Sequence, residues 1–284
     1  DERSLAETVA LAVRFLDDVI DASRYPLPEI EAICRANRKI GLGVMGLADL
    51  LLEMEIAYGS PQSLALIDHL MTVIEDAAVR ETPPLARERG AFPDFAISRY
   101  AAAGEPPRRN ATVTTVAPTG SISLIAGCSS GIEPLYALAY RHEGRFAQVV
   151  EPHPALVAAL ERAGLATPEM LQQIEETGRI GHMTTLPDDL RGRFRVASEI
   201  PVAEHLAVQA VVQRHVENAV SKTINLPAEA TVDDVRSAYS EAHRLGCKGV
   251  TIYRDGSRAG QVLQVLGRCL ACTGEDRLPR TSVA

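Results

Sequence analysis

A run of β-branched residues that ends in a tight turn spans residues 109–123 and reads RNATVTTVAPTGSIS. The alternation over residues 112–116 is typical of a strand, and a Pro-Thr-Gly-Ser turn then leads into an apolar segment of helical character at residues 122–126. The predicted order is therefore strand, loop and helix start. Such a loop directs backbone N–H groups and hydroxyls at one point, where the helix N-terminus adds partial positive charge. We interpret it as a candidate phosphate site, with a plain turn as the alternative.

The residues of this loop suit an anion. Gly120 allows a ligand to approach the backbone closely, because glycine has no side chain. The hydroxyls of Thr119 and Ser121 can donate hydrogen bonds. The N–H groups of Ser121 and Ile122 are expected to be free, because the first N–H groups of a helix have no partner within it.

The bulk composition excludes several classes of protein. The chain has 284 residues and is 46% hydrophobic, which is enough for one large domain or two small ones. Its formal net charge is -8 and no run of Lys and Arg is present, so a nucleic-acid polymer is not an expected partner. No segment approaches the ~18 consecutive apolar residues of a membrane helix. Five cysteines do not suggest a disulfide framework, and a cytoplasmic location is expected.

Helical patterns dominate the chain and alternate with a few strands, which predicts an α/β fold. Ser4 is expected to cap the first helix, and Pro83-Pro84 to interrupt or kink a later one. Further helices are predicted from residue 29 and over residues 40–53, 63–89, 154–164, 168–178, 203–222 and 232–245, and strands over residues 112–116, 135–140 and 247–253.

Residues 41–46, GLGVMG, fit the G-x-G-x-x-G pattern of a dinucleotide-binding loop. Such a site needs an apolar strand before the glycines and an acidic residue roughly 20 positions after them. The preceding residues, CRANRK at 34–39, are not such a strand, and Asp68 falls within a predicted helix. We therefore interpret the glycines as sites of close helix packing, which leaves a nicotinamide dehydrogenase as the least favoured function.

Several blocks of sequence together resemble the large catalytic subunit of ribonucleotide reductase, and specifically the adenosylcobalamin-dependent class II enzymes. The blocks follow the order of that family and cover the chain to about residue 263, with only a loose match over residues 144–195. They are ANRKIGLGVMGLAD at 36–49, residues 110–123, CSSGIEP at 128–134, NAVSKTINLP at 218–227 and GCKGVTIYRDGSR at 246–258. Class I subunits carry an adjacent tyrosine pair in the last strand, whereas KGVTIY at 248–253 has Tyr253 alone.

The resemblance implies a fold and a domain organisation. Residues 1–259 would be the C-terminal part of the family's ten-stranded α/β barrel, helix-rich, and residues 260–284 a flexible tail. The chain starts at Asp1 without an initiating Met, so we expect a cut inside a longer protein. The family's Cys-x-Asn-x-Glu radical motif is absent from the 284 residues. We therefore expect no catalytic residue in this chain, a missing N-terminal half, and no turnover by the chain alone.

The resemblance also implies the activity, which is the reduction of ribonucleotides, with diphosphates favoured, to deoxyribonucleotides for DNA replication. Adenosylcobalamin would start a thiyl radical that removes the 3′ hydrogen, the 2′ hydroxyl would leave as water, and a cysteine pair would supply electrons. Expected partners are the ribonucleotide, a thioredoxin-like reductant and a second copy in a homodimer. The alternative is a non-catalytic nucleotide- or phosphate-binding module. The implied substrate-diphosphate loop consists of Ala117, Pro118, Thr119, Gly120, Ser121 and Ile122.

The cysteines fall into two groups. Cys269 and Cys272 form a C-x-x-C pair in the predicted tail, a spacing found in redox motifs and in half of a zinc site. No second ligand pair accompanies it, so we predict no metal site. The resemblance implies a redox-active shuttle that re-reduces the active site, and a structural or degenerate pair is the alternative. Cys34, Cys128 and Cys247 are expected to be small buried hydrophobes, and Cys128 lies closest in sequence to the candidate loop.

Three other polar residues receive no catalytic role. Glu133 is a carboxylate in an apolar stretch, and it either orders the adjacent loop by accepting backbone hydrogen bonds or is exposed. His205 and His215 lie ten positions apart on a predicted helix and face different directions, so they form no metal pair and are read as surface or core histidines.

Overall fold

The computed structural model describes residues 1–143 and 148–257, which divide into two compact units. The first unit comprises residues 1–135 and the described residues from 197 onward, and the second comprises residues 136–196. The predicted tail, with Cys269 and Cys272, lies outside the described residues.

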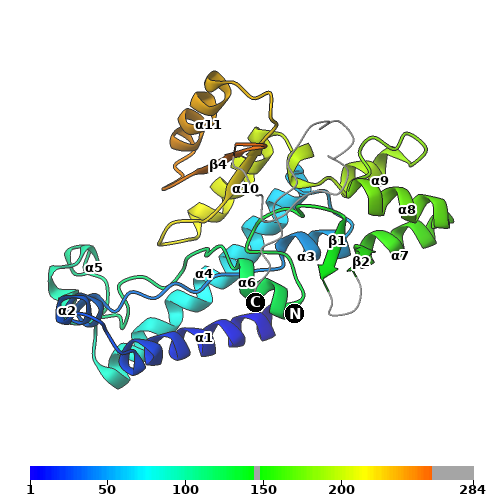
Figure 1. Ribbon diagram of the computed structural model, residues 1–284. Helices are drawn as coiled ribbons and strands as arrows, with labels where there is room; N and C mark the ends of the chain where they lie inside the picture. Colours follow the sequence, from blue (N-terminus) through cyan, green and yellow to red (C-terminus); the bar gives the residue numbers. More distant parts are fainter. Residues whose placement is uncertain (144–147, 258–284) are drawn as a thin grey trace, which may run out of the picture. The chain divides into compact units, whose positions relative to one another are not determined.

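Two long helices build much of the first unit's core. α1 (Glu2–Ala22) packs against α4 (Pro61–Arg89), as Figure 1 shows. Val9 and Val13 of α1 belong to the same buried cluster as Met71 and Ile74 of α4. The cap predicted at Ser4 is wrong, because the Asp1 carboxylate accepts the N–H groups that start α1.

α4 continues through Pro83 and Pro84, so the predicted interruption is wrong. A proline has no N–H and leaves the carbonyl four residues earlier without its helical partner. The Thr82 hydroxyl donates to that carbonyl of Val79 over 3.2 Å. The Thr82 carbonyl in turn accepts the Arg109 N–H, which joins the helix to the segment that leads to the candidate loop.

Extended segments run side by side through the first unit. The predicted strand at 112–116 is extended and is held by parallel bridges, Leu42↔Thr114 on one side and Val116↔Val220 on the other. β3 (Thr223–Leu226) then pairs in parallel with β4 (Thr251–Arg254). β4 starts four residues later than predicted. This parallel arrangement suits a barrel-type α/β fold.

The helix predicted over residues 40–53 is wrong for its first part. Residues 40–42 are extended, and only α3 (Leu47–Glu53) is helical. A Cβ at Gly41 would lie 2.6 Å from Thr115 Cγ2, and one at Gly43 would lie 2.6 Å from the Thr115 carbonyl oxygen. The glycines therefore serve close packing, as predicted, but between extended segments.

The remaining elements of the first unit surround these segments. α10 ends at Arg214, not at residue 222, because Gln213 Nε2 donates to the carbonyls of Val216 and Asn218 and the chain then becomes extended. α11 begins at residue 232, as predicted, and Thr231 is its N-cap. The elements are α2 (Pro28–Asn37), η1 (Pro93–Ile97), α5 (Arg99–Ala102), α6 (Gly120–Ala126), η2 (Ala197–Glu199), α10 (Val202–Arg214) and α11 (Val232–Arg244).

The second unit has its own small core of Leu138, Leu156, Leu160, Ile174 and Phe194. β1 (Ala139–Glu143) pairs antiparallel with β2 (Gln148–Pro152), so the strand predicted over 135–140 overlaps only the start of β1. α7 (Pro154–Arg162) and α8 (Pro168–Thr177) confirm the predicted helices, and α9 (Asp188–Arg193) follows them.

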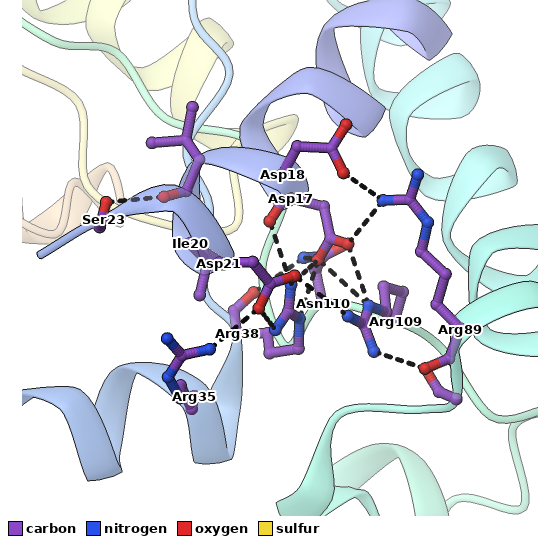
Figure 2. Close-up of polar contacts among 12 residues, drawn as sticks. Asp17, Asp18, Ile20, Asp21, Ser23, Arg35, Arg38, Arg89, Arg109 and Asn110 are labelled. Carbon is purple, nitrogen blue, oxygen red and sulfur yellow. Dashed lines mark hydrogen bonds and ion pairs between the residues drawn. The ribbon is translucent and has the colours of Figure 1, made fainter.

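A buried carboxylate joins α1 to the start of residues 109–123 (Figure 2). Asp17 is fully buried, and its oxygens accept from Arg109 Nε at 3.0 Å, Asn110 Nδ2 at 2.9 Å and Arg38 Nε at 2.9 Å. Burial by itself raises the pKa of Asp17, but the hydrogen bonds from Arg109, Arg38 and Asn110 outweigh it and lower that pKa below its ordinary value.

Among the described residues, no helix is both long and apolar enough to cross a membrane.

Candidate functional site

The predicted loop opens α6 and leaves its first N–H groups available. Thr119 is the N-cap residue, with a left-handed backbone at φ 54°. The Ser123 N–H donates to the Thr119 carbonyl over 2.9 Å. The N–H groups of Gly120, Ser121 and Ile122 have no hydrogen-bond acceptor within the described part of the chain. This is the arrangement expected for the start of a helix.

The same loop lies at the surface. Ala117, Pro118, Gly120, Ser121 and Ile122 are exposed, and Thr119 is half-buried. A Cβ at Gly120 would meet no described atom within 4 Å, so nothing in the described fold requires glycine there. The open space beside this backbone is where a ligand could approach closely.

The Thr119 side chain links the loop to residues 128–134, which we name the support loop. Gly131 N–H donates to Thr119 Oγ1 over 2.8 Å, so the Thr119 hydroxyl proton stays available to donate. Ser123 Oγ lies 2.9 Å from Ser130 Oγ, and the Cys128 N–H donates to the Ser123 carbonyl over 3.0 Å. Two of the segments that carry the sequence resemblance, residues 110–123 and 128–134, are therefore in direct contact.

The support loop is tied to the rest of the first unit. The Ser129 N–H donates to Asp49 Oδ2 over 2.6 Å, and the Ser129 carbonyl accepts the Gly46 N–H over 2.8 Å. The buried Tyr58 hydroxyl donates to the Ile132 carbonyl over 2.7 Å. These bonds leave the support loop little freedom.

Near the end of the support loop, the half-buried Glu133 forms an ion pair with the buried Lys222. Its Oε2 accepts from Lys222 Nζ and its Oε1 from the Thr223 N–H, each over 2.6 Å. This confirms that Glu133 accepts a backbone hydrogen bond, although the donor belongs to the start of β3. Lys222 Nζ also donates to His205 Nδ1 over 2.8 Å and to the Thr223 carbonyl over 2.5 Å. The three protons of the ammonium group therefore have three acceptors.

Burial sets the electrostatics of this cluster. The Lys222 side chain is fully buried, which lowers its pKa, while the Glu133 charge acts in the opposite direction. Burial, and secondly the Glu133 charge, raise the pKa of Tyr58. His205 accepts at Nδ1 and its Nε2 lies 3.1 Å from the Ala197 carbonyl oxygen, so its proton sits on Nε2. His205 is a core histidine, which is one of the two alternatives that the sequence left open.

The other predicted residues lie apart from this site or beside it. His215 is held between Asp68 and Glu75, each 2.9 Å from a different ring nitrogen. Cys34, Cys128 and Cys247 are half-buried free thiols, less enclosed than predicted, and burial raises the pKa of Cys247. Across the described ranges, no group of three or more His, Cys, Asp or Glu residues could hold a metal ion.

Lys222 is the residue that sequence reasoning missed. It lies directly before β3, in AVSKTINL at 219–226, where apolar and polar residues are mixed. A lone lysine there is a signal for a buried partner, because a charge in the interior must be paired. The identity of that partner, 89 positions away in sequence, was not readable from the pattern.

Comparison with known proteins agrees with this architecture. Residues 1–253 match the family model described as "Ribonucleotide reductase, barrel domain", and the chain belongs to that family. A solved structure, the class Id ribonucleotide reductase alpha subunit of Actinobacillus ureae, superposes with a TM-score of 0.75 over 88% of this chain and 46% of that chain. At 24% identity this likeness shows the fold, and it confirms the predicted α/β barrel architecture.

Similar sequences carry a more specific name. The vitamin B12-dependent ribonucleoside-diphosphate reductase of Mycobacterium tuberculosis (strain CDC 1551) is 51% identical over 259 residues, which are 91% of this chain and 37% of that protein. The protein of the same name from Thermoplasma acidophilum is 43% identical over 260 residues, 91% of this chain and 34% of that protein. The chain thus spans about a third of the length of these relatives.

Proposed function

We propose that this chain is the substrate-diphosphate-binding part of a vitamin B12-dependent ribonucleoside-diphosphate reductase. The observation that carries the proposal is the exposed start of α6, where the N–H groups of Gly120, Ser121 and Ile122 have no acceptor among the described residues. The chain is also 51% identical over 259 residues to a reductase of that name.

The loop binds a diphosphate through neutral donors. Residues 117–122 contain no Lys or Arg, so hydrogen bonds from backbone N–H groups and from the hydroxyls of Thr119 and Ser121 hold the phosphate oxygens. Gly120 lets those oxygens reach the backbone. Fixing the diphosphate sets the position of the ribose relative to the reacting groups, which is the contribution of this chain to the rate.

Adenosylcobalamin supplies the radical that starts the reaction when it is bound. The buried side-chain atoms without a described partner are Arg108 Nε, Asn110 Oδ1, Ser129 Oγ and Gln209 Oε1. Arg108 and Asn110 belong to one segment and Ser129 and Gln209 to two others, and none belongs to residues 117–122, so we assign no corrin contact to them. The radical cysteine is not assigned to this chain, because its sequence lacks the Cys-x-Asn-x-Glu motif.

The remaining expected partners belong to the same proposal. Cys269 and Cys272 are the candidates for passing electrons from a thioredoxin-like reductant, and a homodimer is the expected assembly. This chain matches only about a third of the length of its relatives. Turnover therefore requires reductase residues that the relatives carry outside that matched part.

A chimeric reductase tests the proposal. In it, this chain replaces the matching 259-residue segment of the Mycobacterium tuberculosis relative. With adenosylcobalamin, a dithiol and each common ribonucleoside diphosphate, the chimera should form deoxyribonucleotide, and the isolated chain should form none. Ser121→Ala and Gly120→Val should raise KM for the substrate by about tenfold or more.

Two outcomes would contradict the proposal. If a folded, active chimera has the same KM in both loop variants, the loop does not bind the diphosphate. If a folded chimera binds ribonucleoside diphosphates in calorimetry but has no turnover, the non-catalytic binding module is the better description.

A further inference from the structure

We propose that Glu133 and Lys222 are positioning residues for the diphosphate loop, which they hold in its binding conformation through the support loop. The inference rests on the proposed function. Neither side chain belongs to residues 117–122, but a chain of contacts leads from the ion pair to Thr119.

The ion pair fixes one end of the support loop. Glu133 is two residues from Gly131, and its carboxylate is held both by Lys222 and by the Thr223 N–H at the start of β3. The other end is fixed at Ser129 by Asp49. Gly131 lies between these two anchors, so its position follows from both.

Gly131 in turn contacts the diphosphate loop. Its N–H donates to Thr119 Oγ1, and a Cβ added to it would lie only 3.1 Å from the Ala117 carbonyl oxygen. A displacement of Gly131 would therefore disturb its hydrogen bond to Thr119, and there is no room for a side chain between the two loops. Glycine at this position also has a φ of 48°, which lets it turn tightly there.

Thr119 needs this support because its backbone is unusual. A β-branched residue with a φ of 54° is a strained conformation that persists only when its surroundings enforce it. The bond from Gly131 also occupies an acceptor position of the Thr119 hydroxyl and thereby leaves its proton to donate. A donor directed toward the exposed start of α6 is what a phosphate oxygen requires.

The ion pair is suited to hold a fixed geometry. Lys222 is fully buried and donates to Glu133, His205 and the Thr223 carbonyl, so its ammonium group has a single satisfied arrangement. Charges in such surroundings interact strongly, and an unpaired one is expensive. The cluster therefore resists the small displacements that would release Gly131.

The test uses the chimeric reductase with variants of the pair. Glu133→Gln and Lys222→Met should each raise KM for the ribonucleoside diphosphate by about tenfold, with kcat changed by less than about twofold. Asp17→Asn is the matched control, since it breaks another buried ion cluster of the same unit, on α1. It should lower stability and leave KM unchanged.

The double variant Glu133→Gln/Lys222→Met separates positioning from stability. It leaves no unpaired buried charge, so its stability should return toward that of the wild type. Its KM should stay raised, because the anchor of the support loop is still absent. If either single variant fails to fold, this double variant still decides the question.

Hydrogen exchange in the isolated chain gives a readout independent of turnover. The Gly131 amide should exchange faster in the double variant than in the wild type, and amides in the middle of α4 should not change.

The outcomes distinguish this inference from the function on which it rests. If the double variant has wild-type KM and Gly131 exchange while Ser121→Ala raises KM, the positioning role is wrong and the loop assignment stands. If none of these variants changes KM in an active chimera, both proposals are wrong.

Discussion

The N–H of Gly131 donates a hydrogen bond of 2.8 Å to Oγ1 of Thr119. It joins the candidate loop, residues 117–122, to the support loop, two segments that the sequence by itself relates only by their order along the chain. The bond makes the loop depend on residues that need not touch a ligand, and it connects the exposed start of α6 to the ion pair of Glu133 and the buried Lys222.

Gly131→Ala should raise KM for the substrate while it lowers the stability of the fold only moderately. The new methyl group would lie 3.1 Å from the Ala117 carbonyl oxygen and would displace the diphosphate loop. Gly127→Ala is the control: Gly127 also has a positive φ, 67°, but its added Cβ would meet no described atom within 4 Å. Both variants should lose about 1 kcal/mol of stability. Only Gly131→Ala should raise KM in the chimeric reductase, and an equal KM in the two would contradict the contact argument.

Gly120→Ala should leave the fold intact and impair ligand binding. A Cβ at Gly120 meets no described atom within 4 Å, so the free energy of unfolding should change by less than about 0.5 kcal/mol. The methyl group would instead fill the space through which the phosphate approaches the backbone. Thermal denaturation and KM measured side by side check this. A raised KM with an unchanged melting temperature is expected, and an unchanged KM would show that no ligand comes this close.

Asp17→Asn should destabilise the chain by about 3 kcal/mol at neutral pH, because it leaves Arg38 and Arg109 without their buried partner. The pKa of Asp17 is below its ordinary value of 3.8 in the folded state. Its stabilising contribution is therefore fully present above about pH 4 and is lost as the pH falls through the folded-state pKa. Urea titrations at several pH values should show the difference between variant and wild type shrinking below pH 4, and a constant difference would exclude this ion cluster as the cause.

Glu133→Gln should destabilise the chain, and the loss of stability should become smaller as the pH rises from neutral to alkaline. Lys222 contacts Glu133 and His205, and the Tyr58 ring faces His205; of these groups only Glu133 raises the pKa of Lys222 against the effect of burial. Without that carboxylate the pKa of Lys222 falls further. A lysine with a lowered folded-state pKa costs stability while it is charged. This cost is greatest below the folded-state pKa, and it decreases as the pH rises from that pKa toward the ordinary value of 10.5.

The stability difference between Glu133→Gln and the wild type should therefore decrease from neutral to alkaline pH, in denaturant titrations up to about pH 10. Lys222→Met in the Glu133→Gln background should abolish this pH dependence, since no titrating amine remains. A difference that stays constant with pH in the single variant would mean that Lys222 is not the group responsible.

Local patterns predicted the elements whose signals are local. The strand, loop and helix start of residues 109–123 follow from alternation and from Gly120, and the Thr231 cap marks the start of α11. The helix predicted over residues 40–53 was wrong at its start because Gly41 and Gly43 pack closely on Thr115, a contact between distant segments. Burial against a neighbouring segment overrides the helical character of an apolar run.

The amino-acid sequence by itself determined the family resemblance, the position of the candidate loop and its free N–H groups, because a helix start leaves its first donors unpaired whatever surrounds it. Only the tertiary structure decided that Lys222 meets Glu133, and that Gly131 meets Thr119. Such pairings depend on how α6, the support loop and β3 come together, since a hydrogen bond between distant residues acts over about 3 Å and leaves no period or spacing in the sequence.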